Sequence, residues 1–189
     1  TRIPAAFAVL FVGCFLSADE PKKSIRPKTI LVIRHAEKPE SGPDLNEAGK
    51  KRAEALIGLF KKSDTRPDPF PLPDFVFAAA SEKSDRSFQT VTPLAKSLNL
   101  EVRHEIKNND FAVLADELLS KPKYDGKTVL IAWHHGKMPE LVHALGVDPQ
   151  PKKFDDGVFD RVWVVTFDAK GQAKLADLPQ ALMPGDAKK

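Results

Sequence analysis

The sequence is poor in cysteine, because Cys14 is the only one among its 189 residues. A single cysteine excludes an internal disulfide framework and a metal site built from thiolates. The chain also lacks an excess of charge of one sign: 29 Lys and Arg residues stand against 26 Asp and Glu residues, for a formal net charge of +3. Because these charges are scattered along the chain, nothing in them favours a nucleic-acid partner.

Long apolar runs are confined to residues 3–16, which follow Arg2 and carry no charge. The run is shorter than the roughly 20 residues that a membrane-spanning helix needs. A basic start, an apolar stretch and a small-residue exit at Ala18 are typical of an export signal, so we expect residues 1–18 to be removed and the protein to be periplasmic or extracellular. Two alternatives stay open: a lipoprotein signal that anchors the protein to a membrane through a lipid on Cys14, and a buried N-terminal helix.

The rest of the chain has the composition of one globular domain, since the sequence contains 42% hydrophobic and 29% charged residues. Its length is sufficient for a single hydrophobic core. We assign this domain to residues 29–178, after a flexible lead-in at residues 19–28 and before a tail at residues 179–189. The lead-in and the last five residues, 185–189, are rich in charge and poor in apolar residues, and both are expected to be solvated.

Strand-like and helix-like segments alternate along this domain. Short runs of β-branched and apolar residues predict buried strands, whereas apolar residues at helical spacing predict amphipathic helices. This alternation predicts an α/β fold, a three-layer sandwich with a central, mostly parallel sheet flanked by helices. The expected strands are 29–33, 75–79, 129–133 and 161–167, with a weaker one at 100–104 and a short final one at 173–176.

Four helices are expected between these strands. The first spans residues 46–62, with Asn46 as its N-cap. The second begins near residue 84 or 85 and is either kinked at Pro93 or starts later because of it. The third begins at Asp110, and the fourth follows His135 and ends at Gly146.

Three of the expected strands run into basic side chains at their carboxyl ends. Arg34 and His35 follow the first strand, His134 follows another, and Arg86 follows a third after a polar turn. Because parallel strands bring their carboxyl ends to one edge of a sheet, we expect these four side chains to converge. Two imidazoles and two guanidinium groups form a pocket suited to a tetrahedral oxyanion, since arginine presents forked donors that match phosphate oxygens.

Four segments, in a fixed order, carry a family resemblance. They are Leu31-Val32-Ile33-Arg34-His35-Ala36-Glu37-Lys38-Pro39, Asp44-Leu45-Asn46-Glu47-Ala48-Gly49-Lys50-Lys51-Arg52-Ala53, residues 81–92 with Arg86, Gln89 and Thr90, and His134-His135-Gly136-Lys137-Met138-Pro139-Glu140-Leu141. The ordered set covers roughly residues 28–166 and resembles the histidine phosphatase superfamily, also called the phosphoglycerate mutase-like superfamily. The resemblance implies a phosphoglycerate mutase-like fold.

The resemblance also implies an enzyme, a phosphatase that hydrolyses a phosphomonoester or a phosphorylated side chain without a metal ion or other cofactor. His35 would be the nucleophile that attacks phosphorus and becomes phosphohistidine, which water then hydrolyses. Arg34, Arg86 and a charged His134 would bind the substrate and stabilise the phosphoryl oxygens. The implied partner is a phosphorylated small molecule or a phosphoprotein. A non-catalytic module that binds a phosphorylated ligand, or a phosphomutase, are the alternatives.

The sequence departs from the family pattern at two points. His135 stands where the family has a small residue, and it could contact the substrate, narrow the pocket or face solvent. The general acid that protonates the leaving oxygen is not obvious, and Glu105 and Asp110 are the candidates. Glu105 could equally be a surface charge, and Asp110 could equally be the N-cap of the third helix.

Two further groups have open roles. A metal site from His134, His135 and His143 is conceivable, although adjacent residues at a strand end point in opposite directions. Residues 155–157, together with Phe159 and Trp163, form either a rim near the substrate or only a turn into a strand whose Trp163 belongs to the core.

Overall fold

The computed structural model describes residues 25–64 and 66–187. The predicted export signal, Cys14 and most of the expected lead-in therefore lie outside the described residues. Among the residues that the structure describes, no helix combines the length and the apolar character needed to cross a bilayer.

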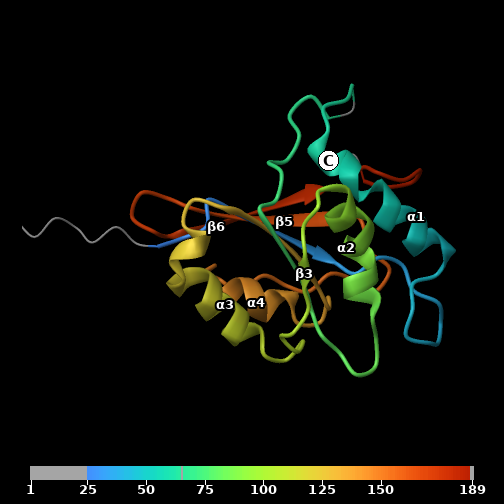
Figure 1. Ribbon diagram of the computed structural model, residues 1–189, viewed down its shortest axis with the longest axis horizontal. Coiled ribbons are helices and arrows are strands. Elements are labelled where there is room, and N and C mark those ends of the chain that lie inside the picture. Colours follow the sequence, from blue (N-terminus) through green and yellow to red (C-terminus); the bar gives the residue numbers. More distant parts are fainter. Residues whose placement is uncertain (1–24, 65, 188–189) are drawn as a thin grey trace, which may run out of the picture.

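A single sheet with the strand order β3-β2-β4-β1-β5-β6 forms the centre of the described chain (Figure 1). Neighbouring strands β3, β2, β4 and β1 are parallel, whereas β5 pairs with β1, and β6 with β5, in the antiparallel sense. The prediction of a mostly parallel sheet is confirmed. The strands are β1 Thr29–Arg34, β2 Phe75–Ala78, β3 Val102–Arg103, β4 Thr128–Trp133, β5 Arg161–Phe167 and β6 Ala173–Pro179.

Helices cover both faces of this sheet, so the predicted three-layer sandwich is confirmed (Figure 1). One face packs against α2 (Arg86–Ser97) and the 3₁₀ turn η1 (Leu56–Phe60), which follows α1 (Glu47–Ala55). The other face packs against α3 (Phe111–Ser120) and α4 (Met138–Ala144). All residues of β1 and β4 are buried, because central parallel strands are covered on both sides.

Several element boundaries differ from the prediction for local reasons. Asn46 caps α1 as expected, and its side chain accepts a hydrogen bond from the backbone N–H of Gly49. The helix then tightens into η1, whose i→i+3 geometry aligns Leu56 and Leu59 on one buried face. The second helix begins at Arg86 and includes Pro93, so the alternative of a later start is wrong.

The predicted N-cap position of Asp110 is confirmed, but its side chain does not cap the helix. Asp110 occupies the N-cap position of α3, but its side chain makes no capping hydrogen bond. Its backbone carbonyl instead accepts a hydrogen bond from the N–H of Val113 in the first turn.

The ends of the domain are packed rather than solvated, which corrects the expectation for the described part of both ends. Gln180 is 1% exposed, and Asp186 forms a buried ion pair with Arg52 at 2.8 Å. At the other end Pro27 is buried, and the guanidinium of Arg26 lies over the ring of Phe167. A charge-rich segment can therefore belong to the folded domain when its charges find partners on it.

Candidate active site

His35 lies where β1 ends, and the backbone around it is held from both sides. The N–H of His35 donates to the carbonyl of Trp133 on β4 at 3.2 Å, and the N–H of Ala36 donates to Oγ1 of Thr90 on α2 at 2.8 Å. The apolar residues of β1 bury this strand in the core, so the chain emerges at the sheet edge with His35 in a fixed position. Sheet and helix together therefore set the position of this imidazole.

The hydrogen bonding of His35 identifies the nitrogen that is available for reaction. Its Nδ1 lies 2.7 Å from the carbonyl oxygen of Ala36, which can only accept a hydrogen bond. The proton of the neutral ring therefore sits on Nδ1, and Nε2 keeps its lone pair. Burial lowers the pKa of His35 to about 3, and the charges of Arg34, His134 and Arg86 act in the same direction. His35 is consequently a neutral imidazole at physiological pH, which is the form that a nucleophile requires.

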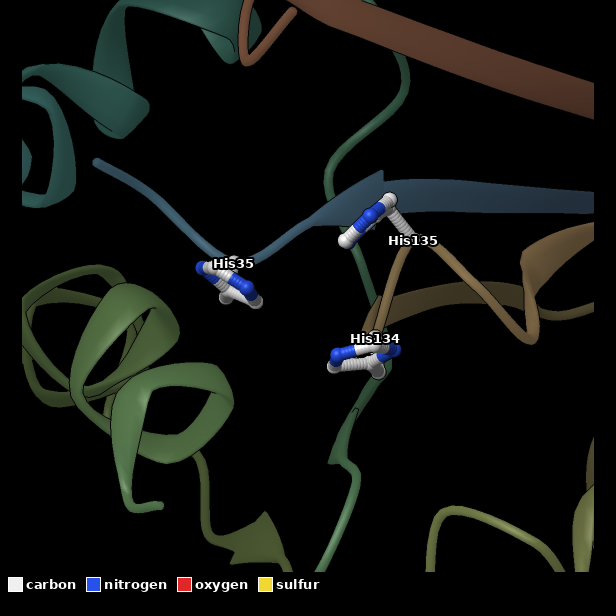
Figure 2. Close-up of side chains that lie close together, drawn as sticks. All are labelled: His35, His134 and His135. Carbon is white, nitrogen blue, oxygen red and sulfur yellow. The ribbon is translucent and has the colours of Figure 1, made fainter. Parts of the chain in front are cut away.

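His134 and His135 follow β4 and lie opposite His35 (Figure 2). Their ring centroids are 6.0 Å and 6.3 Å from the ring of His35. Nδ1 of His134 accepts a hydrogen bond from the N–H of Gly136 at 3.2 Å, which leaves an Nε2–H donor on the neutral ring. The structure therefore brings the two predicted histidines together and adds His135 to them.

The predicted positive charge on His134 is not supported for the free protein. Burial lowers the pKa of His134 below its usual value, and the neighbouring His135, Arg34 and Arg86 lower it further. A neutral His134 can still donate a hydrogen bond to a phosphoryl oxygen through Nε2. A bound anion would favour the protonated ring, because opposite charge stabilises the charged form.

Arg34 is the strongest sign of an anion site. Its side chain is buried, its Nη1 donates to the carbonyls of Asp156 at 2.7 Å and Val158 at 2.9 Å, and its guanidinium lies 3.9 Å from the ring centre of Phe159. Nε and Nη2 are buried as well, yet neither has a hydrogen-bond partner among residues 25–64 and 66–187. Burial lowers its pKa to about 10, so the group stays charged at neutral pH. Two unpaired donors on a buried cation are costly unless an acceptor arrives to meet them.

The same contacts decide between the two interpretations of the segment that precedes β5. Residues 155–158 supply carbonyl groups to Arg34, and Asp156 reaches His135, whose Nε2 lies 3.0 Å from its Oδ1. The segment is therefore a rim of the site and not only a turn. Asp156 is the carboxylate that contacts this histidine cluster through His135, and the sequence indicated it only as part of the Asp155-Asp156-Gly157 segment.

Arg86 is close to the histidines but is held by a loop. It is the first residue of α2, and its guanidinium donates to the backbone carbonyls of Asp44, at 3.2 Å, and Gly42. Its charge lowers the pKa of both His35 and His134, as expected for a cation beside them. The structure therefore places His35 and His134 near each other at one end of the sheet, whereas the guanidinium of Arg86 is bonded to the loop at residues 42–44.

The two predicted general acids are not brought into this group. Glu105 is exposed, and its charge acts on Arg103 and Tyr124. Asp110 is exposed in front of α3. The charge of the Asp156 carboxylate raises the pKa of each of Arg34, His134 and His135.

The three histidines also form a geometry that could hold a metal ion. One ring nitrogen from each of His35, His134 and His135 lies within 4.8 Å of the others. The alternative grouping with His143 is wrong, because the cluster found among the described residues consists of His35, His134 and His135. The neighbouring buried Arg34 places a positive charge with unpaired donors at the same site, so the electrostatics favour an anion over a cation.

Comparisons with known proteins identify the fold. No protein-family model matches the sequence, and a search of curated proteins finds no match. Among solved structures, mycobacterial hydrolase 1 is similar at a TM-score of 0.58 and 14% identity, over 84% of this chain and 100% of that one. The mycobacterial glucosyl-3-phosphoglycerate phosphatase gives a TM-score of 0.55 at 14% identity, over 79% and 97% of the two chains. The putative phosphohistidine phosphatase SixA from Agrobacterium tumefaciens gives 0.53 at 19% identity, over 80% and 98%.

These neighbours show that the chain has the fold of the histidine phosphatase, or phosphoglycerate mutase-like, superfamily. The fold that the sequence motifs implied is thereby confirmed. Because the identities are low, what the site does is argued from its own residues.

Proposed function

We propose that the chain is a phosphatase that hydrolyses a phosphomonoester or a phosphorylated side chain through a phosphohistidine intermediate on His35. One observation carries the proposal: a buried Arg34 with two unpaired donors lies next to a neutral His35. Donors without acceptors support an anionic ligand, and a free imidazole lone pair beside them supports attack on that ligand.

In the first step, Nε2 of His35 forms a bond to phosphorus while the bond from phosphorus to the leaving oxygen breaks. Nδ1 keeps its proton, because the carbonyl of Ala36 holds it there. In the second step, a water oxygen bonds to phosphorus, the phosphorus–nitrogen bond breaks, and inorganic phosphate leaves. Arg34, Arg86 and the Nε2–H of His134 stabilise the equatorial oxygens in both transition states.

The residues described above would contact only the phosphoryl group of the substrate. They do not specify the rest of the substrate molecule. The fold neighbours include a glucosyl-3-phosphoglycerate phosphatase and a putative phosphohistidine phosphatase, so small molecules and phosphoproteins both remain in the proposal. We further propose that the reaction needs no metal ion and that the export signal in residues 1–18 places it outside the cytoplasm.

Hydrolysis of p-nitrophenyl phosphate tests the proposal. The wild-type protein is expected to turn over this substrate equally with and without a chelator. His35→Ala should lower kcat/KM by at least about 10³-fold, because the nucleophile is lost. His143→Ala is the matched control, since His143 lies outside the histidine cluster, and it should retain the wild-type rate.

A second function, a module that binds a phosphorylated ligand without turnover, is favoured by the exposed positions of Glu105 and Asp110. Binding of phosphate or vanadate without hydrolysis of any phosphomonoester would establish the module and overturn the phosphatase. An activity that disappears with the chelator and returns with added metal would overturn metal independence alone.

A further inference from the structure

His135 and Asp156 form a pair at the edge of the histidine cluster. Nε2 of His135 lies 3.0 Å from Oδ1 of Asp156, and the ring of His135 is mostly buried while the carboxylate is exposed. The backbone carbonyl of Asp156 accepts a hydrogen bond from the guanidinium of Arg34 at 2.7 Å. The arginine that is proposed to bind phosphate therefore also holds the residue that orients His135.

The pair assigns different roles to the two nitrogens of His135. The hydrogen bond from His135 and the charges of His135 and Lys153 lower the pKa of Asp156, so this group is a carboxylate that can only accept. Nε2 of His135 is then the donor, and Nδ1 is the nitrogen that can gain and lose a proton. Nδ1 is buried and has no hydrogen-bond partner anywhere in the described part of the chain.

A buried nitrogen without a partner indicates that its partner comes with the substrate. The ring of His135 lies 4.7 Å from that of His134 and 6.3 Å from that of His35, centroid to centroid. Figure 2 shows His135 and His134 together across from His35, and one ring nitrogen of each of the three lies within 4.8 Å of the others. A phosphoryl group bound between the three rings would therefore lie beside His135. The two carboxylates proposed from the sequence as proton donors do not belong to this cluster.

We propose that His135, oriented by Asp156, is the general acid and base of the reaction. This inference rests on the proposed phosphatase function. In the first step Nδ1–H of His135 gives its proton to the leaving oxygen as the bond between that oxygen and phosphorus breaks. In the second step neutral Nδ1 takes a proton from the attacking water, which restores the acid. The sum is one phosphomonoester and one water converted to one alcohol and one phosphate.

The surroundings of His135 are compatible with both proposed proton transfers, to the leaving oxygen in the first step and from water in the second. Burial and the charges of Arg34 and Lys153 lower its pKa, whereas Asp156 raises it, and the net pKa lies below the usual value. His134 is the other titratable ring packed beside it, and the charge of His135 lowers the pKa of His134. The neutral ring is then present for the water step, and the protonated ring is a stronger acid than ordinary imidazolium.

Two substrates that differ in whether the leaving oxygen needs a proton can distinguish a general acid from a residue with only a structural role. p-Nitrophenolate leaves without protonation, whereas an alkyl oxygen, as in β-glycerol phosphate, does not. His135→Asn is expected to lower kcat/KM by about 10²–10⁴-fold for β-glycerol phosphate and by a far smaller factor for p-nitrophenyl phosphate. Asp156→Ala should show the same pattern with a smaller loss, because the ring is kept but loses the acceptor that orients it.

The rival acids supply matched controls. Asp110→Asn and Glu105→Gln should leave both substrates at the wild-type rate. With β-glycerol phosphate the wild-type kcat should also rise as the pH falls toward the pKa of His135, and His135→Asn should remove this rise.

Equal losses with both substrates in His135→Asn would mean a structural role and would overturn the inference, as would a selective loss in Asp110→Asn or Glu105→Gln. In either case an active wild-type protein leaves the proposed function intact. A wild-type protein that hydrolyses neither substrate would overturn the proposed function, and this inference with it.

Discussion

At the scale of single residues, Arg34 has the most specific task. Its guanidinium donates through Nη1 to two backbone carbonyls, whereas Nε and Nη2 are buried without a hydrogen-bond partner among the described residues. We propose that these two groups bind the phosphoryl oxygens. Lysine keeps the charge but cannot reproduce this planar set of donors. Arg34→Lys should therefore lower kcat/KM for p-nitrophenyl phosphate by roughly 10²–10³-fold.

Arg161→Lys provides the control for this substitution, because the guanidinium of Arg161 pairs with Asp177 across β5 and β6. It should retain the wild-type rate. A fully active Arg34→Lys protein would show that a positive charge alone is sufficient for activity. It would contradict the proposed role of the planar guanidinium donors of Arg34.

The titration of His35 makes a prediction about stability. Its pKa is about 3 in the folded protein and about 6.5 in the unfolded chain, so the unfolded chain binds the proton first as the pH falls. The free energy of unfolding should therefore decrease between pH 6.5 and pH 4.5, with a slope that approaches about 1.4 kcal/mol per pH unit for this group. The lowered pKa values of His134 and His135 act in the same direction.

Urea unfolding at several pH values measures this slope, and His35→Asn should make it shallower. A protein whose stability increases on acidification over this range would contradict the neutral, buried state of His35.

At the scale of elements, the sequence predicted what depends on local pattern. The runs before Arg34 and His134 are continuous and apolar, so their burial as β1 and β4 and the position of both side chains at the sheet edge followed directly. The contact between Arg34 and Asp156 could not be predicted, because it joins the end of β1 to a loop more than a hundred residues later. Nothing in the local sequence distinguishes the carbonyls of that loop from those of any other turn.

Helix α1 is positioned against the loop after His35 by a glycine. A Cβ on Gly49 would lie 2.2 Å from the carbonyl oxygen of Glu37, and backbone cannot move aside as a flexible side chain can. Gly49→Ala should lower the free energy of unfolding by about 1–3 kcal/mol through overpacking, and it should reduce activity by displacing the loop.

Lys51→Ala, on the exposed side of the same helix, should change stability by less than about 0.5 kcal/mol. Chemical denaturation of the two variants measures the difference. A Gly49→Ala protein as stable and active as wild type would show that the close approach of helix and loop has no consequence.

At the scale of the whole molecule, one buried arginine ties the C-terminal segment to the site. Arg52 of α1 forms ion pairs of 2.8 Å with Glu37, which follows His35 by two positions, and with Asp186. It also donates to the side-chain oxygen of Gln180 at 3.1 Å. The sequence could not reveal this cluster, because a Gly-Asp-Ala segment near the end of a chain has the composition of a solvated tail.

Asp186→Asn should therefore destabilise the folded state, since a buried guanidinium loses one of its two carboxylate partners. We expect a loss of about 1–3 kcal/mol in the free energy of unfolding, because Glu37 continues to neutralise Arg52. Asp177→Asn removes a more exposed partner of Arg161 and should cost less than about 1 kcal/mol. Equal effects of the two substitutions would contradict a structural role for the C-terminal segment.

The central claim, that His35 is the nucleophile, is tested most directly by trapping the phosphorylated protein. After brief incubation with a ³²P-labelled phosphomonoester and an alkaline quench, the label is predicted on His35, stable to base and released by acid. His35→Asn should carry no label, whereas His143→Ala should carry the wild-type amount. A label on another residue, or turnover by the His35→Asn protein at the wild-type rate, would contradict the account.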